Sequence, residues 1–310
     1  MPLARSRLLW WLSLPALALA AFAWHGGEGL GGRVTTRTAH RDPQVADIPA
    51  MRVGDGFLAE RSNALAVPTA ASGFDAQRDF YQYARTLAGA AEQGDAQAAW
   101  TLSRVYDYCA AYAQDPSGYA ADSMRLETST DAGVAAMVRA RARVARRCAG
   151  FSPADGLGAQ AVLDERVQAA RAGSLASEAS LLALGRPLQD SADYRRGLVQ
   201  RVLASRDPQA FAAIAPAMGA AANGDAAYRG FVAGDQFALL AWQLAACRLG
   251  LDCGADSALM TGYCANAGIC SRDATQNFSN FVFDAAVPGQ GADKMDELVN
   301  TLIQTEGETS

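Results

Sequence analysis

From Phe74 onward, no segment of the sequence alternates convincingly between apolar and polar residues, as a half-buried β-strand does. β-Branched residues are sparse there, whereas alanine, leucine, arginine and glutamine, all good helix formers, are abundant. This combination predicts an all-α body. Hydrophobic residues make up 50% of the chain of 310 residues, which is enough for a sizeable core.

The expected helices cover residues 75–92, 95–113, 131–149, 158–172, 175–185, 191–204, 207–222, 225–250, 255–266 and 292–304. Several of their ends are recognisable. Thr130 or Asp131 can accept the free N–H groups of a first helical turn. Pro208 follows Asp207 at a helix start, where its missing N–H costs nothing. Gly250 stands where a C-terminal glycine stop belongs.

Three segments pair small residues with a glycine turn and then a further helix: Ala90–Leu102, Ala169–Leu181 and Ala221–Val232. Small residues let antiparallel helices approach closely, and the glycine makes the turn between them. The best of the three continues as AAEQGDAQAAWTLSRVYDYC, Ala90 to Cys109. It resembles the A-x-x-G-x-x-x-A-x-x-x-L-x-x-x-Y pattern of Sel1-like repeats, which like TPR repeats are helix–turn–helix units.

The resemblance implies a protein-binding scaffold without a catalytic motif. The repeated glycines, Gly94, Gly173 and Gly224, are not evenly spaced, so no fixed period holds. The expected architecture is therefore an irregular bundle or short array of helical hairpins.

Six cysteines raise the question of a metal site, a redox centre or covalent bridges. Four of them, Cys247, Cys253, Cys264 and Cys270, follow the spacing C-x5-C-x10-C-x5-C. Zinc knuckles bring their ligands in C-x2–4-C pairs, and a thioredoxin-like centre needs C-x-x-C. Neither spacing occurs here, so structural disulfides are the prediction and no metal or cofactor is expected.

The remaining two cysteines, Cys109 and Cys148, end two expected helices, and we expect them to pair with each other. The C-terminal four should pair among themselves, and their three possible connectivities stay open. Two such bridges would hold the helix that ends at Cys247 to the glycine-rich segment after it. The expected fold is thus all-α and disulfide-stapled.

The N-terminal residues indicate export. Arg5 and Arg7 precede the apolar run Leu8–Trp24, and Ala21-Phe22-Ala23 has the form of a signal-peptidase site. Residues 1–24 are predicted to be either a cleaved signal peptide or a retained N-terminal membrane anchor. In the second case, residues 8–24 attach the protein to the inner membrane. Export to an oxidising, periplasmic compartment also suits disulfides.

Residues 25–73 are rich in glycine, poor in apolar residues and without clear periodicity. They are predicted to form a flexible tether or a leader without a role of its own, ahead of an all-α domain at 74–310. A long tether suits a retained anchor better than a free protein.

The charge pattern excludes several functions. A formal net charge of -5 argues against nucleic acid as a partner, which needs a basic footprint. The two histidines, His25 and His40, precede the predicted domain, so imidazole-based nucleophile systems and the commonest catalytic zinc ligands are not expected in it.

One candidate binding surface remains. In MVRARARVARRC, Arg139, Arg143 and Arg147 are spaced i, i+4, i+8, and Arg146 is adjacent. They predict either a cationic helix face for an anionic partner or a solvated face that complements the helix dipole.

Carboxylates alone can cleave glycosides, so an exported helical protein could act on the cell wall. The nearest match to a lytic-transglycosylase motif is Ser177–Gly185, which contains Glu178, but its serine is displaced. Glu178 is expected to be a solvated residue on a helix surface. The leading hypothesis is a non-enzymatic envelope protein that binds another protein. The alternatives are a carboxylate-dependent peptidoglycan enzyme and a tethered structural spacer.

Overall fold

The computed structural model describes residues 70–304, in which helices joined by loops and turns are the regular structure and no strand occurs. Its first helices are α1 (Ala70–Ala76), α2 (Phe80–Glu92), α3 (Ala96–Gln114), α4 (Pro116–Glu127), α5 (Ala132–Cys148), α6 (Ala159–Arg171) and α7 (Leu175–Ala183). They are followed by α8 (Ala192–Ser205), α9 (Pro208–Met218), α10 (Gln236–Arg248), α11 (Ala258–Ala267), α12 (Phe278–Ala285) and α13 (Ala292–Ile303). The all-α prediction is confirmed for this part of the chain.

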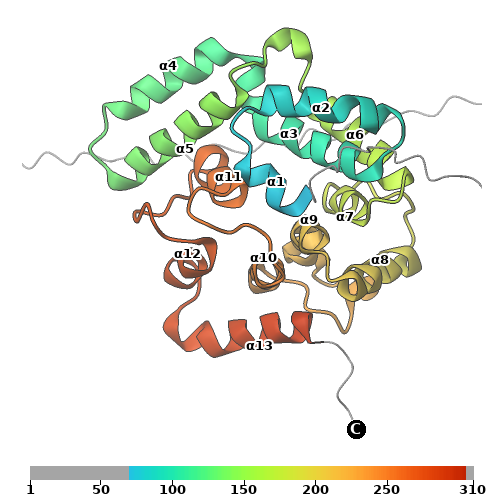
Figure 1. The fold of residues 1–310 in the computed structure, drawn as a ribbon. Coiled ribbons are helices and arrows are strands. Elements are labelled where there is room, and N and C mark those ends of the chain that lie inside the picture. Colours follow the sequence, from blue (N-terminus) through green and yellow to red (C-terminus); the bar gives the residue numbers. More distant parts are fainter. Residues whose placement is uncertain (1–69, 305–310) are drawn as a thin grey trace, which may run out of the picture. The chain divides into compact units, whose positions relative to one another are not determined.

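Two helical hairpins lie side by side. Gly94 turns α2 back onto α3, and Gly173 turns α6 back onto α7; both glycines have a positive φ, of 89° and 103°. Helix α3 packs against α6, which joins the two hairpins (Figure 1). After Gly224, by contrast, the chain makes only a short 3₁₀ turn, Ala226–Tyr228, rather than a second α-helix.

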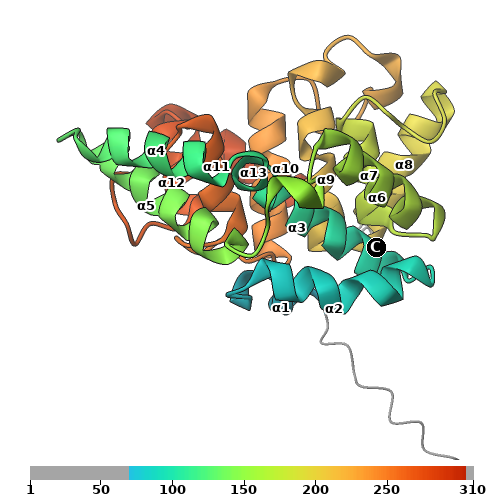
Figure 2. The ribbon, with the colours of Figure 1, turned by 90° about the horizontal axis from the view of Figure 1, so that it is seen from above.

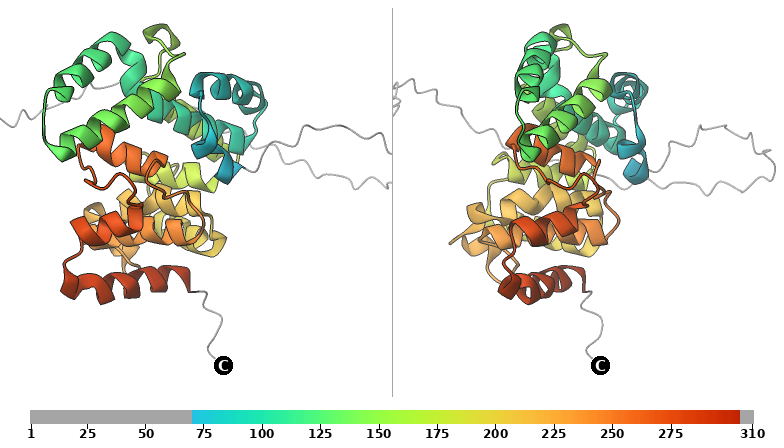
Figure 3. Two further views of the ribbon diagram at one scale, coloured as in Figure 1. Left: turned by 60° about the vertical axis from the view of Figure 1, so that its left-hand side comes forward. Right: turned by 90° about the vertical axis from the view of Figure 1, so that its left-hand side faces the viewer.

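The C-terminal half extends this array. Helix α7 packs against α9, α9 against α10, and α10 against α13. A second arm is formed by α4 and α5, which pack together, and by α11, which packs against α5. Figure 3 shows α13 at the opposite end of the described body from the α4–α5 hairpin, and Figure 2 shows that hairpin projecting from one side.

One continuous hydrophobic core runs through the described residues. Its largest fully buried side chains include Phe80, Phe211, Trp242 and Phe278. The rings of Phe211 and Trp242 lie 5.0 Å apart between centroids and fix α9 against α10. None of the helices between residues 70 and 304 is long and apolar enough to cross a membrane.

Three disulfides staple this body, as expected. Cys109 of α3 is bonded to Cys148 of α5, with 5.5 Å between the Cα atoms. The four C-terminal cysteines pair locally, as Cys247–Cys253 and Cys264–Cys270. The first of these local bridges ties the end of α10 to the next loop. The second closes the end of α11 instead, so only one of the two holds the helix that ends near Cys247.

Most expected helix ends are found. Asp131 accepts hydrogen bonds from the N–H groups of Gly133 and Val134 and starts α5. Asp207 caps α9, with Pro208 in the first turn. Gly250 takes a φ of 108° directly after α10.

Four expectations about the elements are wrong. The helix expected at 75–92 is interrupted, because Asp79 caps a new helix that begins at Phe80. Helices α4 and α12 are not among the expected ones. Helix α10 begins at Gln236 rather than at residue 225, because Asp235 caps it there.

Helix α1 begins at Ala70, before the expected boundary at Phe74, so the last part of the predicted tether is helical. The predicted signal peptide or anchor at 1–24 and the rest of the tether, 25–69, lie outside the described residues.

Candidate anionic-partner face and the polar networks of the body

Helix α5 carries the four arginines that predict an anionic-partner face. Its buried stripe consists of Ala136, Ala140, Val144 and Cys148, spaced four residues apart. Positions 139, 143 and 147 each precede a member of that stripe by one residue, about 100° around the helix axis. The arginine stripe therefore borders the buried face instead of lying opposite it. As a result, its arginines differ in burial and in their partners.

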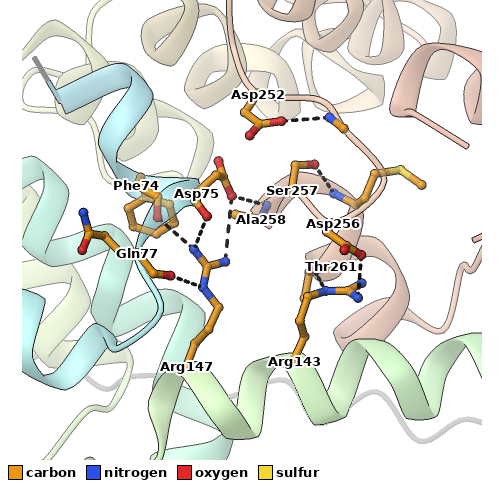
Figure 4. Close-up of polar contacts among 12 residues, drawn as sticks. Phe74, Asp75, Gln77, Arg143, Arg147, Asp252, Asp256, Ser257, Ala258 and Thr261 are labelled. Carbon is orange, nitrogen blue, oxygen red and sulfur yellow. Dashed lines mark hydrogen bonds and ion pairs between the residues drawn. The ribbon is translucent and has the colours of Figure 1, made fainter. Parts of the chain in front are cut away.

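Arg147 is buried, with 7% of its surface exposed. Its guanidinium donates hydrogen bonds to the backbone carbonyl oxygens of Phe74 (2.8 Å), Asp75 (3.1 Å) and Gln77 (2.9 Å), at and just beyond the end of α1 (Figure 4). It also lies 4.1 Å from the centroid of the Phe80 ring. Arg147 therefore holds α1 and the start of α2 on α5.

Asp75 extends this network to α11. Its carboxylate accepts a hydrogen bond of 2.6 Å from the backbone N–H of Ala258, in the first turn of α11, and lies 3.9 Å from the guanidinium of Arg147. Burial raises the pKa of Asp75 above its ordinary value, although this hydrogen bond and the neighbouring arginines oppose the shift. One carboxylate and one guanidinium thus join three segments that are distant in sequence.

Arg143 is half-buried and already neutralised. It forms an ion pair of 2.7 Å with Asp256 and donates a hydrogen bond of 3.1 Å to the hydroxyl of Thr261 (Figure 4). The side chain of Asp256 is 77% exposed, so this pair lies at the edge of the protein.

Arg139 and Arg146 are exposed. Arg139 and Arg143 line a cleft of about 260 Å³, which Asp256 and Asp273 also line. Two arginines and two aspartates therefore line the cleft, so their formal charges sum to zero. The four arginines do not form the single cationic face that their spacing predicts: Arg147 is buried, Arg143 is paired, and only two members are exposed.

Glu178 is the second residue whose environment differs from the prediction. It is expected on a solvated helix surface, but only 8% of it is exposed. Its carboxylate accepts hydrogen bonds from the hydroxyl of Tyr194 (2.7 Å) and from Nη1 of Arg201 (2.8 Å), both on α8. The network therefore connects α7 to α8.

The network also sets the protonation of its members. Burial alone would raise the pKa of Glu178, but the hydrogen bonds from Arg201 and Tyr194 outweigh it, and this pKa lies below its ordinary value. Burial and the carboxylate of Glu178 raise the pKa of Tyr194. Glu178 is consequently an anion at neutral pH, and Tyr194 stays protonated and donates to it.

One feature of the sequence does point to this network, namely a single carboxylate within an otherwise uncharged helix. In α7, LASEASLLA, Glu178 is the one charged residue, and both of its neighbours in sequence are buried. A lone carboxylate within an apolar helix has to find a cation or hydrogen-bond donors when that helix is buried. Arg201 and Tyr194, however, cannot be identified as its partners without the packing of α7 against α8.

No group of three or more histidine, cysteine or acidic side chains within residues 70–304 is arranged to hold a metal ion. The protein is all-α and disulfide-stapled, and its disulfides are typical of an oxidising compartment. Its buried charges join helices to one another.

Comparison with known proteins adds no relative: no protein family, no curated protein and no solved structure matches the chain.

Proposed function

We propose that the chain is an exported protein of the bacterial cell envelope that binds another protein as a non-enzymatic scaffold. The observation that carries this proposal is the use of Glu178, Asp75 and Arg147: these three charged groups are engaged in hydrogen bonds that join helices to one another. Stacked helical hairpins commonly serve as protein-binding surfaces. The sequence from residue 41 onward also contains no histidine, which supports binding over nucleophilic catalysis.

The proposed location is the periplasm. Three disulfides fit an oxidising compartment, and the apolar run at residues 8–24 with its basic flank fits an export signal. Retention of that run would anchor the protein in the inner membrane, and its removal would release it.

The pKa of Glu178 weighs against the alternative of a peptidoglycan-cleaving enzyme. The acid in such enzymes needs a raised pKa, so that it holds a proton at neutral pH and can give it to the leaving oxygen. The pKa of Glu178 is lowered, and its carboxylate is already bonded to Arg201 and Tyr194.

Photo-crosslinking in intact cells tests the proposal. A photoreactive phenylalanine analogue replaces, one at a time, Met124 on α4, Leu184 after α7 and Ile269 after α11, which are large apolar side chains exposed on the surface. Glu127, an exposed polar residue of α4, serves as the control position. Partners are purified through a C-terminal tag and identified by mass spectrometry, and the intact mass of the chain reports whether residues 1–24 are retained.

One partner that is captured reproducibly from one face, and not from Glu127, is the expected result. Recovery of peptidoglycan fragments without a protein from any position would contradict the scaffold proposal. Recovery of neither would favour the tethered spacer.

A further inference from the structure

A cavity of about 570 Å³ lies between the C-terminal ends of α8 and α13 and the loop that precedes α10. Its volume is within the range of about 300–1,000 Å³ typical of ligand sites. The residues that line it are Gln200, Leu203, Ala204, Arg206, Gly230, Phe231, Val232, Trp242, Thr301, Leu302 and Gln304. Apolar residues and residues with amide or hydroxyl side chains both contribute to this lining.

The part of the lining formed by Gly230, Phe231 and Val232 is held in place from several sides. The indole N–H of Trp242 donates a 2.8 Å hydrogen bond to the carbonyl oxygen of Val232. Arg196 donates to the carbonyl oxygen of Arg229 at 2.8 Å, and its guanidinium lies 5.0 Å from the centroid of the Phe231 ring. The cavity is therefore pre-formed, which lowers the entropic cost of binding a ligand.

Arg206 is the one charged residue among those that line the cavity. It has a φ of 51°, and within residues 70–304 it is the one residue other than glycine with a positive φ. Glycine or asparagine usually takes this position after a helix, because other side chains strain the backbone there. The chain keeps an arginine at this strained position, and such strain often accompanies functional sites.

The guanidinium of Arg206 is only partly used. Nη1 donates a 2.6 Å hydrogen bond to the carbonyl oxygen of Ile303, at the end of α13. A guanidinium has five N–H donors in a planar fork, so several remain for a ligand in the cavity that Arg206 lines. A carboxylate matches this fork and can accept two hydrogen bonds from it.

We infer that this cavity binds the C-terminal end of a partner polypeptide. The free carboxylate pairs with Arg206, and an apolar last side chain packs on Leu203, Phe231 and Leu302. Gln200, Thr301 and Gln304 both donate and accept hydrogen bonds, as the peptide groups of an extended chain require. An acyl chain would leave these polar groups unused, which favours a peptide over a fatty acid. The inference rests on the proposed scaffold function and names the feature that the scaffold recognises.

Fluorescence anisotropy tests this site with the full chain, purified in mild detergent. The probes are fluorescein-labelled hexapeptides that end in leucine, phenylalanine or aspartate, each with a free or an amidated C-terminus. The free-carboxylate peptides that end in leucine or phenylalanine should bind. Amidation should weaken their affinity about tenfold or more, because it removes a charge-assisted hydrogen-bonded pair.

Three variants distinguish the effect of the Arg206 charge on affinity from an effect on folding. Arg206→Gly places the favoured residue at the positive φ, so the melting temperature should hold while affinity falls about as much as on amidation. Arg206→Lys keeps the charge and should retain more affinity than glycine. Arg186→Gln, at an exposed arginine elsewhere, is the control and should bind like the wild type.

The inference fails if free and amidated peptides bind equally, if none binds, or if Arg206→Gly retains full affinity. Preferential binding of dodecanoate in competition would assign the cavity to a fatty acid and would also overturn it. Photo-crosslinking separates this failure from that of the proposed function. If wild type and Arg206→Gly capture a partner equally, the scaffold proposal stands and the inferred binding site is wrong. If the wild type captures no partner, the scaffold proposal itself is wrong.

Discussion

At the scale of single residues, Arg147 and Glu178 show how buried charge serves this fold. Arg147 donates to three carbonyl oxygens around the end of α1, where the helix dipole favours a positive charge. Glu178 accepts hydrogen bonds from two side chains of α8. Each group therefore keeps the hydrogen-bonding partners that burial would otherwise remove.

Replacing Arg147 by methionine should destabilise the protein by about 3–5 kcal/mol, the usual cost of removing one member of a buried charge network. The methionine fills a similar volume but leaves the carbonyl oxygens at the end of α1 without their donor. Chemical denaturation measures the effect. Arg146→Met, at the exposed neighbouring residue, should change stability by no more than about 0.5 kcal/mol. Equal losses in the two variants would contradict this assignment.

Asp75 and Glu178 should give opposite pH dependences. The pKa of Glu178 is lowered in the folded state, so wild type should lose stability relative to Glu178→Gln as the pH falls below the unfolded value of about 4.3. The pKa of Asp75 is raised, so wild type should gain stability relative to Asp75→Asn as the pH falls towards about 3.9.

Denaturation at several pH values between 7 and 3.5 measures both differences. Parallel curves for wild type and Glu178→Gln would show that Glu178 keeps an ordinary pKa. A wild-type curve that falls relative to Asp75→Asn on acidification would show that the sign assigned to Asp75 is wrong.

At the scale of elements, the three disulfides differ in the length of chain that they close. Cys109–Cys148 spans 39 residues and joins α3 to α5, whereas Cys264–Cys270 spans 6 and closes a single helix end. Loop-closure entropy grows with the length of the closed loop. The long bridge should therefore contribute more to stability than either local one.

Replacing Cys109 and Cys148 together by serine should cost about 4 kcal/mol, against about 2 kcal/mol for Cys264 and Cys270. The same denaturation measurement on the two double variants compares them directly, since each removes one bridge and adds two hydroxyl groups. A larger loss for the short loop would show that local strain or packing, rather than chain entropy, sets the contribution.

The turn after α5 lies very close to α2. A Cβ atom added at Gly150 would come within 2.6 Å of the Cβ and Cγ atoms of Tyr81. Gly150→Ala should therefore destabilise the protein by about 1–3 kcal/mol, as overpacking does. Gly89→Ala, inside α2 and with no atom near the added carbon, should instead stabilise it by about 0.5–1 kcal/mol. The difference in melting temperature between these two variants checks the contact, and the same sign for both would refute it.

The elements also show what the sequence can and cannot specify. Local chemistry predicts the start of α5 at Asp131 and the bond between Cys109 and Cys148, because caps and helix ends are local features. It does not predict α4, where Pro116 lies in the first turn and Asp115 accepts the N–H of Gly118. Proline and glycine are typical of loops but are tolerated in a first helical turn.

The candidate sites depend on tertiary packing more than the helix ends and the disulfides do. The spacing of Arg139, Arg143 and Arg147 places them on one stripe, but the position of that stripe beside the buried face follows from how α11 and α1 pack on α5. The same limit applies to Glu178, whose partners on α8 are not adjacent in sequence. Arg206 becomes a candidate only through its backbone conformation and the cavity it lines.

At the scale of the whole molecule, every cysteine of the chain is bonded to another. A maleimide reagent should therefore label no thiol in the native protein and six after unfolding and reduction. Intact-mass spectrometry counts the labels. Protein produced in a reducing cytoplasm should be labelled before reduction and should melt at a lower temperature. Labelling of protein isolated from the envelope would contradict the complete pairing.

The junction of α1 with α5 also has a mechanical consequence. Arg147, which holds α1, is followed directly by Cys148, which is bonded to α3. A pull on the chain ahead of α1 would load the three hydrogen bonds from Arg147, and the one from Ala258 to Asp75, before it reached this covalent bridge. Helix α1 would detach first under force, while the bridge kept α3 and α5 together. Detachment of α1 would thus relieve the load before the helices behind it unfolded.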